Sequence, residues 1–134
     1  MSEIALVIPT LGHGGAERVM SELANEWAAK GHNVHLILLA NQPEFYSVNN
    51  NVVIHYIGFN SKGGLKKVWA EMMVFCKLRK AIIRAKPDFV LSFMVKYNIL
   101  TILATRFTNI RTFVSDRSNP RKSVPFYLAI LRKL

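Results

Sequence analysis

One segment constrains the fold of this chain more than any other, residues 4–20, with the sequence IALVIPTLGHGGAERVM. A short apolar run ends at Pro9, a glycine cluster follows, and a helical pattern begins at Ala16. This order predicts a strand, a tight loop and a helix, so the backbone N–H groups of the loop lie where the helix dipole favours an anion. The glycines leave the main chain open to close approach by a ligand: Gly12, Gly14 and Gly15. The segment therefore predicts a phosphate-sized pocket at the carboxyl end of the first strand.

Along the rest of the chain, short apolar runs alternate with helical patterns. We expect strands over residues 4–8, 34–39, 52–57, 88–93 and 111–115, and helices over 16–30, 65–85, 97–107 and 124–134. Continuous apolar strands that alternate with helices are typical of a parallel sheet covered on both faces. We therefore predict an α/β fold, a Rossmann-like doubly wound parallel sheet, forming a single domain over residues 1–134.

The flanks of the glycine cluster argue against two common nucleotide sites. In the dinucleotide fingerprint, a third small residue follows the first two glycines, and an acidic residue ends the second strand. Here Glu17 stands at the third position, and the second strand finishes at Ala40 and Asn41 without a carboxylate. No Gly-Lys-Ser/Thr follows the glycines, so a Walker loop fails as well. A nucleotide-dependent oxidoreductase is therefore disfavoured.

Several stretches match a known family instead. The chain carries Pro9-Thr-Leu-Gly-His-Gly-Gly-Ala-Glu-Arg18, then Leu23-Ala24, then Lys30-Gly-His-Asn-Val34. This resembles the opening of bacterial family 4 glycosyltransferases, whose usual pattern is P-x-L-x-x-G-G-A-E-R, then L-A, then G-H-x-V. A second echo is Val114-Ser-Asp-Arg-Ser-Asn-Pro120, where those enzymes often carry S-E-R-N-x-P. Aspartate replaces glutamate and serine replaces asparagine in that echo.

The resemblance implies the N-terminal, acceptor-side half of a GT-B fold. Such an enzyme would be a retaining glycosyltransferase of polysaccharide biosynthesis, moving a sugar from a nucleotide-sugar to a glycan or polyprenyl-diphosphate acceptor. In these enzymes a C-terminal domain holds the nucleotide and usually carries Glu-x7-Glu, a pair that this chain lacks. We therefore expect this chain alone to be inactive. The resemblance also implies no cofactor besides the nucleotide-sugar. The single cysteine fits a reducing compartment, so we expect a cytoplasmic location, at the inner face of the cytoplasmic membrane.

Candidate residues for binding the donor diphosphate or the acceptor follow three expected strands. They are Gly12, His13, Gly14, Gly15, Glu17 and Arg18 after the first strand, Lys96 and Asn98 after the fourth, and Asp116 and Arg117 after the fifth. Some relatives place a histidine after the fourth strand, but this sequence has none there, so no catalytic residue is assigned. No metal motif stands out.

Most of these residues also have a purely structural interpretation. His13 is expected to contact a ligand rather than to catalyse, and Glu17 to brace the loop or to compensate the helix dipole. Arg18 could be a solvated arginine, and Asn98 could cap the following helix. Arg117 could pair with a phosphate, with Asp116 bracing it or binding a sugar hydroxyl.

The chain carries a formal net charge of +10, which favours anionic partners. Its most basic segment is the helix expected over residues 65–85. Basic residues fall near one side of this helix, and apolar residues fall near the other: Val68, Trp69, Met72, Phe75, Cys76 and Ile83. We expect the apolar side to be buried, with Cys76 as a small core residue, and the basic side to be solvated.

The alternative is that the basic side docks on anionic lipid. No apolar stretch is long enough for a spanning helix, so any membrane contact would be peripheral. A different class of function also stays open, a standalone basic α/β binding module for acidic membrane or nucleic acid. No recognised nucleic-acid signature supports the second of these partners.

Overall fold

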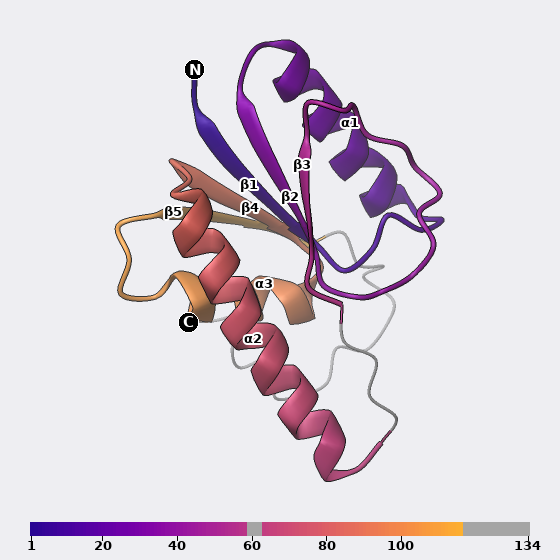
Figure 1. The fold of residues 1–134 in the computed structure, drawn as a ribbon, viewed down its shortest axis with the longest axis vertical. Coiled ribbons are helices and arrows are strands. Elements are labelled where there is room, and N and C mark those ends of the chain that lie inside the picture. Colours follow the sequence, from indigo (N-terminus) through magenta and orange to yellow (C-terminus); the bar gives the residue numbers. More distant parts are fainter. Residues whose placement is uncertain (59–62, 117–134) are drawn as a thin grey trace.

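The computed structural model describes residues 1–58 and 63–116, which form a five-stranded parallel sheet with helices on both faces (Figure 1). The strands are β1 (Glu3–Ile8), β2 (Asn33–Leu38), β3 (Val53–Tyr56), β4 (Phe89–Phe93) and β5 (Arg111–Ser115). The helices are α1 (Gly15–Ala29), α2 (Leu65–Ala85) and α3 (Val95–Thr105). The strands lie in the order β3-β2-β1-β4-β5, and every neighbouring pair is parallel. The fold class predicted from the sequence is confirmed.

Within the described residues, each expected strand and helix is present, with bounds that differ from expectation by two residues at most. The largest difference is at α3, which starts at Val95 rather than at Tyr97. The carbonyl of Met94 accepts hydrogen bonds from the N–H groups of Tyr97 and Asn98, at 3.1 and 2.8 Å, so the first turn forms earlier. The helix expected over 124–134 lies outside the described residues.

The side chains of β1 alternate between two cores. Leu6 and Ile8 face α1 and pack with Met20 and Ala24 of that helix. The residues between them, such as Val7, face the opposite way and pack with α2 and α3. Because side chains along a strand alternate between the two faces of a sheet, a strand buried on both faces is apolar throughout. We call the two sides of the sheet the α1 face and the α2–α3 face.

The strand order places a topological switch point between β1 and β4. The chain leaves β1 to build one edge of the sheet, and it leaves β4 to build the other. In open α/β sheets, ligands bind outside the carboxyl ends of the strands at such a point. The loops after β1 and after β4 are therefore the segments that this fold offers to a ligand.

The orientation of α2 differs from the sequence prediction. Its buried residues are Ala70, Leu78 and Ile82. Of the six side chains expected in the core, Phe75 packs against it, but the others face outward: Trp69 is 72% exposed, Met72 is 59% exposed, and Cys76 is exposed. The prediction was wrong because a narrow stripe of small and aliphatic residues suffices to seat α2 on the sheet. In the parts of the chain that the structure describes, no helix has both the length and the apolar character to cross a membrane.

Candidate functional site

The loop between β1 and α1 ends on Gly14, which is the N-cap of α1. Its carbonyl accepts the N–H of Arg18 at 3.1 Å, and no side chain caps the helix. The Glu17 carboxylate folds back over Gly14, so that a Cβ added to Gly14 would lie 2.1 Å from Oε2 of Glu17. A glutamate three residues after the N-cap is the usual partner of this turn. Gly14 therefore leaves room for the carboxylate that lies against the loop.

The other two glycines of the loop meet no such constraint. A Cβ on Gly15 would have no neighbour within 4 Å, and one on Gly12 would make only ordinary contact with Thr10, at 3.4 Å. Neither glycine has the positive φ that disfavours L side chains. Packing within the domain thus does not account for Gly12 and Gly15, and their open main chain stays available to a ligand.

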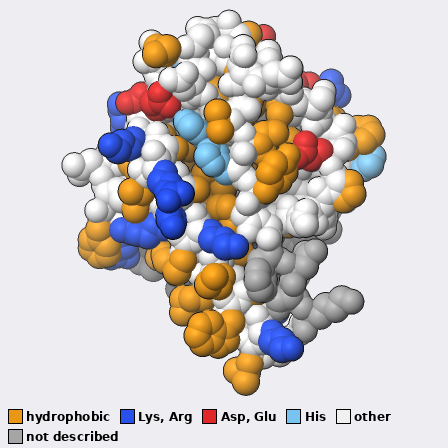
Figure 2. All heavy atoms as spheres, viewed as in Figure 1, with side chains coloured by type: hydrophobic (Ala, Val, Ile, Leu, Met, Phe, Trp, Pro, Cys, Tyr) orange, Lys and Arg blue, Asp and Glu red, His pale blue; other side chains and the backbone are white. Residues whose placement is uncertain are grey.

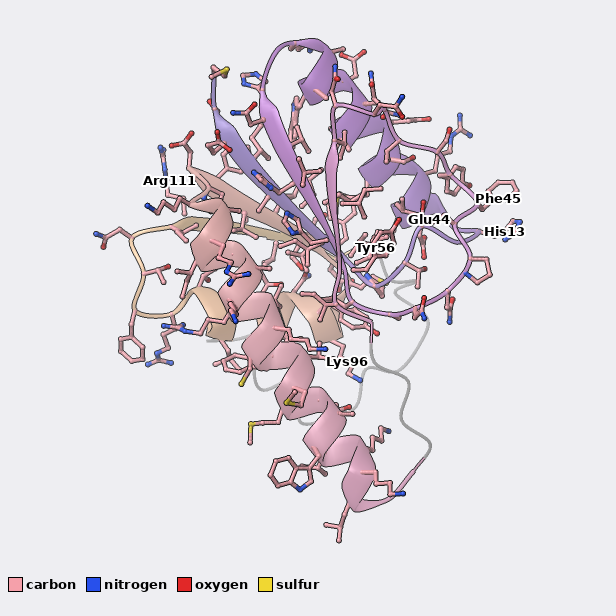
Figure 3. The ribbon with its side chains drawn as sticks, in the orientation of Figure 1. His13, Glu44, Phe45, Tyr56, Lys96 and Arg111 are labelled. Atoms are coloured by element: carbon pink, nitrogen blue, oxygen red, sulfur yellow. The ribbon has the colours of Figure 1, made fainter. Side chains whose placement is uncertain are left out.

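The segment between β2 and β3 lies against this loop. The N–H groups of Phe45 and Tyr46 both donate to the carbonyl of Leu11, at 2.8 and 3.2 Å. The Phe45 ring lies over the imidazole of His13, with 3.9 Å between the ring centroids (Figure 3). Sequence reasoning missed Phe45, because the contact joins segments about 30 residues apart. His13 is exposed and held by an aromatic neighbour, as suits a residue that contacts a ligand.

One ion pair and one hydrogen bond between side chains lie near this part of the site. Arg18 forms an exposed pair with Glu22, with 2.9 Å between Nε and Oε1, and this hydrogen bond raises the pKa of Arg18 above its ordinary value. The Tyr56 hydroxyl donates to Glu44 Oε1 at 2.5 Å, and this bond raises the pKa of Tyr56 (Figure 3). Arg18 is thus a solvent-facing cation in the first turn of α1, and it is paired with Glu22 on the next turn.

Met94, at the carboxyl end of β4, has an unusual backbone. Its φ is 75° and its ψ is 129°, a conformation that costs free energy for a residue with a side chain. The strain is held by surrounding contacts: the N–H of Met94 donates to the carbonyl of Ser115 at 3.3 Å, and its side chain packs on the core. Such outliers cluster at functional sites. The sequence carries no signal for it, since methionine seldom adopts this conformation.

Asn98 does not cap a helix, which corrects the structural interpretation drawn from the sequence. It lies inside α3, is 6% exposed, and donates from Nδ2 to the carbonyl of Ser115 at 3.0 Å. It therefore ties α3 to the end of β5. Its Oδ1 is buried and has no hydrogen-bond partner within the described part of the chain. A buried amide oxygen without a donor is unfavourable, and a ligand donor would satisfy it.

Lys96 lies beside a hollow between α2 and α3. Its Nζ forms an ion pair with Glu71 Oε1 at 3.1 Å and lies 5.9 Å from the centre of the Tyr97 ring. The hollow has a volume of about 230 Å³ and is lined by Leu39, Ala40, Lys67, Ala70, Glu71, Val74, Lys96, Tyr97 and Leu100. It is mainly apolar, with two lysines and one glutamate among its lining residues, and it opens near the carboxyl ends of β2 and β4.

The structure places part of the predicted set at the carboxyl ends of two neighbouring strands, with the glycine loop leading into α1 on one face of the sheet and Lys96 beside the hollow between α2 and α3 on the other. The glycine loop, His13, Lys96 and Asn98 follow β1 and β4, the two strands at the switch point. Asp116 follows directly on β5 and so also lies at the carboxyl ends of the strands, while Arg117 lies outside the described residues. Arg111, labelled in Figure 3, starts β5 and therefore lies at the amino ends of the strands, away from the candidate site.

Three polar side chains cluster on the α2–α3 face, away from the carboxyl ends of the strands. His35 Nδ1 lies 3.0 Å from His55 Nε2, and His35 Nε2 lies 3.3 Å from Glu3 Oε2. Burial, and secondarily the neighbouring His35, lowers the pKa of His55 below its ordinary value. Among the described residues, no group of three or more histidine, cysteine or carboxylate side chains has the geometry to hold a metal ion.

Comparison with solved structures shows the fold first. Sucrose-phosphate synthase of Thermosynechococcus elongatus matches 88% of this chain with a TM-score of 0.67 at 14% identity, over 33% of its own length. UGT2 of Phytolacca americana matches 88% of the chain with a TM-score of 0.57 at 14% identity, over 30% of its length. The domain has the Rossmann-like fold of one half of a GT-B glycosyltransferase.

The family follows from the sequence comparisons. The family model described as Glycosyltransferase Family 4 matches residues 13–134, so the chain belongs to this family, as its resemblance indicated. A Campylobacter jejuni enzyme is 31% identical over the whole chain: GalNAc-alpha-(1->4)-GalNAc-alpha-(1->3)-diNAcBac-PP-undecaprenol alpha-1,4-N-acetyl-D-galactosaminyltransferase. The chain spans 37% of the length of that relative.

Proposed function

We propose that this chain is the acceptor-side domain of a retaining glycosyltransferase, which moves a sugar from a nucleotide-sugar to a glycan or polyprenyl-diphosphate acceptor. Family membership supports sugar transfer over the alternative of a standalone binding module. The relative from Campylobacter jejuni has a name that specifies an undecaprenol-linked saccharide with a PP group, which supports a lipid-linked acceptor.

One observation carries the proposal within the domain itself, the open main chain at Gly15. No side chain caps the start of α1, and Gly12 and Gly15 have room for a ligand beside them, while the Glu17 carboxylate lies against Gly14. Helix N-termini favour anions through their backbone N–H groups and through the helix dipole. We assign this place to the diphosphate of the donor. Arg18, in the same first turn of α1, would add a positive charge by exchanging its pair with Glu22 for the diphosphate.

Sugar transfer requires few other groups from this domain. The acceptor hydroxyl forms a bond to the anomeric carbon of the sugar, the bond from that carbon to the diphosphate oxygen breaks, and the hydroxyl proton leaves with the departing diphosphate. Negative charge grows on the leaving oxygen, and donors already aimed at that position stabilise the transition state. The proposal needs no metal and no cofactor besides the nucleotide-sugar.

The acceptor is assigned to the hollow beside Lys96. Its walls are apolar, with Lys67 and Lys96 as the positive groups and Glu71 and Tyr97 as hydrogen-bonding groups. Small-molecule sites have this composition, an apolar lining with a few polar groups. Asn98 lies on the same helix as Lys96 but does not line this hollow.

In this proposal the nucleotide itself binds to a second domain, and the chain alone is inactive. The reaction takes place in the cytoplasm at the inner face of the cytoplasmic membrane, where nucleotide-sugars meet lipid-linked saccharides.

The test is a transfer assay on the protein as its gene encodes it. It would be incubated with UDP- and GDP-sugars and with polyprenyl-diphosphate saccharides, and the products analysed by mass spectrometry and NMR. The proposal predicts an acceptor extended by one sugar with the anomeric configuration of the donor, and a large loss of product in Gly15→Val. Donor hydrolysis without extension, or an inverted linkage, would contradict it.

A further inference from the structure

The outward side of α2 is apolar, which is unusual for a helix on the surface of a sheet. Large apolar side chains point away from the sheet along the helix: Leu65, Val68, Trp69, Met72, Met73 and Ile83. Leu65 is 83% exposed and Trp69 is 72% exposed. We call these six residues, together with the exposed Cys76, the outer apolar stripe. Contiguous exposed apolar surface marks a contact site for a membrane or a protein.

The charges around the stripe are almost all positive. The helix carries six basic residues, Lys66, Lys67, Lys77, Arg79, Lys80 and Arg84, and one acidic residue, Glu71. The single carboxylate is turned toward Lys96 in an ion pair. A shallow hollow on this side combines apolar Phe75, Cys76 and Ile83 with Arg79, Lys80 and Arg84. Lys67 lines the hollow on the inward side, and Arg79 donates to the carbonyls of Ala104 and Arg106, so four basic residues of α2 remain to flank the apolar surface.

The position of the stripe relates it to the candidate site. The first half of α2 projects past the carboxyl ends of the strands (Figure 1), and hydrophobic side chains gather on that end of the molecule with Lys and Arg beside them (Figure 2). Lys67 and Glu71 line the hollow assigned to the acceptor, on the inward side of the same helix turns. One helix therefore carries the apolar stripe on its outward side and part of the hollow on its inward side.

We infer that α2 docks this domain on an anionic lipid bilayer, with the outer apolar stripe inserted at the level of the headgroups. A helix with tryptophan and aliphatic residues on one side and basic residues along its flanks lies in the plane of the interface. Lipid phosphates complement the excess of cations, whereas a second copy of this chain would set like charges against each other across the contact. This inference differs from the docking expected from the sequence, in which the basic side alone met the lipid.

Docking and sugar transfer are tested separately, because vesicle binding needs neither a donor nor an acceptor. The chain is mixed with vesicles of phosphatidylcholine with about 30 mol% phosphatidylglycerol, and with vesicles of phosphatidylcholine alone. Flotation is expected to recover the chain with the anionic vesicles and far less with the neutral ones. Absence of binding to the anionic vesicles would overturn the inference, even if transfer activity were found.

Paired variants distinguish apolar insertion from simple charge attraction. The double variant Trp69→Ser, Met72→Ser is expected to weaken vesicle binding at least about tenfold, because two apolar side chains no longer enter the bilayer. The control Val53→Ser, Val114→Ser removes two exposed apolar side chains, 50% and 44% exposed, from β3 and β5. It should bind as the original chain does. Equal losses in both double variants, or no loss in the first, would overturn the inference.

Fluorescence gives a direct view of the inserted residue. The chain has two tryptophans, and Trp27 packs against Phe89 in the core, so Trp27→Phe leaves Trp69 as the reporter. Its emission should shift to the blue with anionic vesicles and be quenched by lipids with brominated tails. An unchanged emission, or a blue shift without lipid that depends on protein concentration, would identify a protein contact instead.

Discussion

The two faces of the sheet use their helices differently. On the α1 face, α1 buries Met20, Ala24 and Ala28 in one core and turns charged residues such as Glu22 and Glu26 to solvent. On the α2–α3 face, α2 buries a narrow stripe and turns tryptophan and methionine outward. The comparison shows that folding accounts for the surface of α1, whereas the outward surface of α2 needs a partner to account for it.

The largest expected effect comes from a matched pair of methionines. Met20→Ala, on the α1 face, should lower the free energy of unfolding by about 2–5 kcal/mol, because Met20 is fully buried. Met72→Ala, on the outward side of α2, should change it by less than about 0.5 kcal/mol. Urea unfolding followed by circular dichroism measures both. Similar losses would mean that the outward side of α2 is packed within the domain after all.

The next effect concerns the polar core of the α2–α3 face. Asn98→Ala should cost about 0.5–1.5 kcal/mol, because the half-buried carbonyl of Ser115 loses the hydrogen bond from Nδ2 and keeps only the one from the N–H of Met94. The control is Asn51→Ala, an exposed asparagine between β2 and β3, which should be close to neutral. Urea titration of the two variants checks this. A neutral Asn98→Ala would show that the amide does not hold α3 to β5.

Some features of the fold and of the candidate site could be predicted from the sequence, and others could not. The first strand, the glycine loop and the helix after it were predictable because residues 4–8 are all apolar and glycines interrupt the apolar run before α1. The direction of α2 was not, because apolar residues occur around most of its circumference and the pattern does not say which side meets the sheet. The strain at Met94 and the contact between Phe45 and His13 depend on packing between distant segments, which periodicity does not encode.

A smaller effect, on activity rather than on stability, is expected at Lys96. Lys96→Met should raise the acceptor KM of the encoded enzyme by about fivefold to tenfold and leave the donor KM unchanged, if the hollow holds the acceptor. Stability should change little, since exposed ion pairs contribute about 0–1 kcal/mol. Lys30→Met is the matched control, because Lys30 forms a similarly exposed pair with Glu26 on α1. Equal changes of the acceptor KM in both variants would show that the hollow does not bind the acceptor.

The smallest effect is a pH dependence from the α2–α3 face. Burial lowers the pKa of His55 in the folded state, so the unfolded chain binds a proton at higher pH, near its ordinary value of 6.5. Stability should therefore fall as the pH is lowered through that value, and His55→Asn should reduce the fall. Melting temperatures at neutral and mildly acidic pH test this, with His13→Asn as the exposed control. An unchanged pH dependence in His55→Asn would contradict it.

The central claim is that the loop before α1 binds a diphosphate, and an NMR titration of this chain tests it most directly. Pyrophosphate and UDP would be added to the nitrogen-15-labelled chain, with Gly15→Val as the control, since a Cβ at this position meets nothing within 4 Å. The account predicts that the amide signals of Gly12, Gly14, Gly15 and Ala16 shift together, and that the shifts vanish in Gly15→Val. Shifts confined to the basic residues of α2, or equal shifts in the variant, would contradict it.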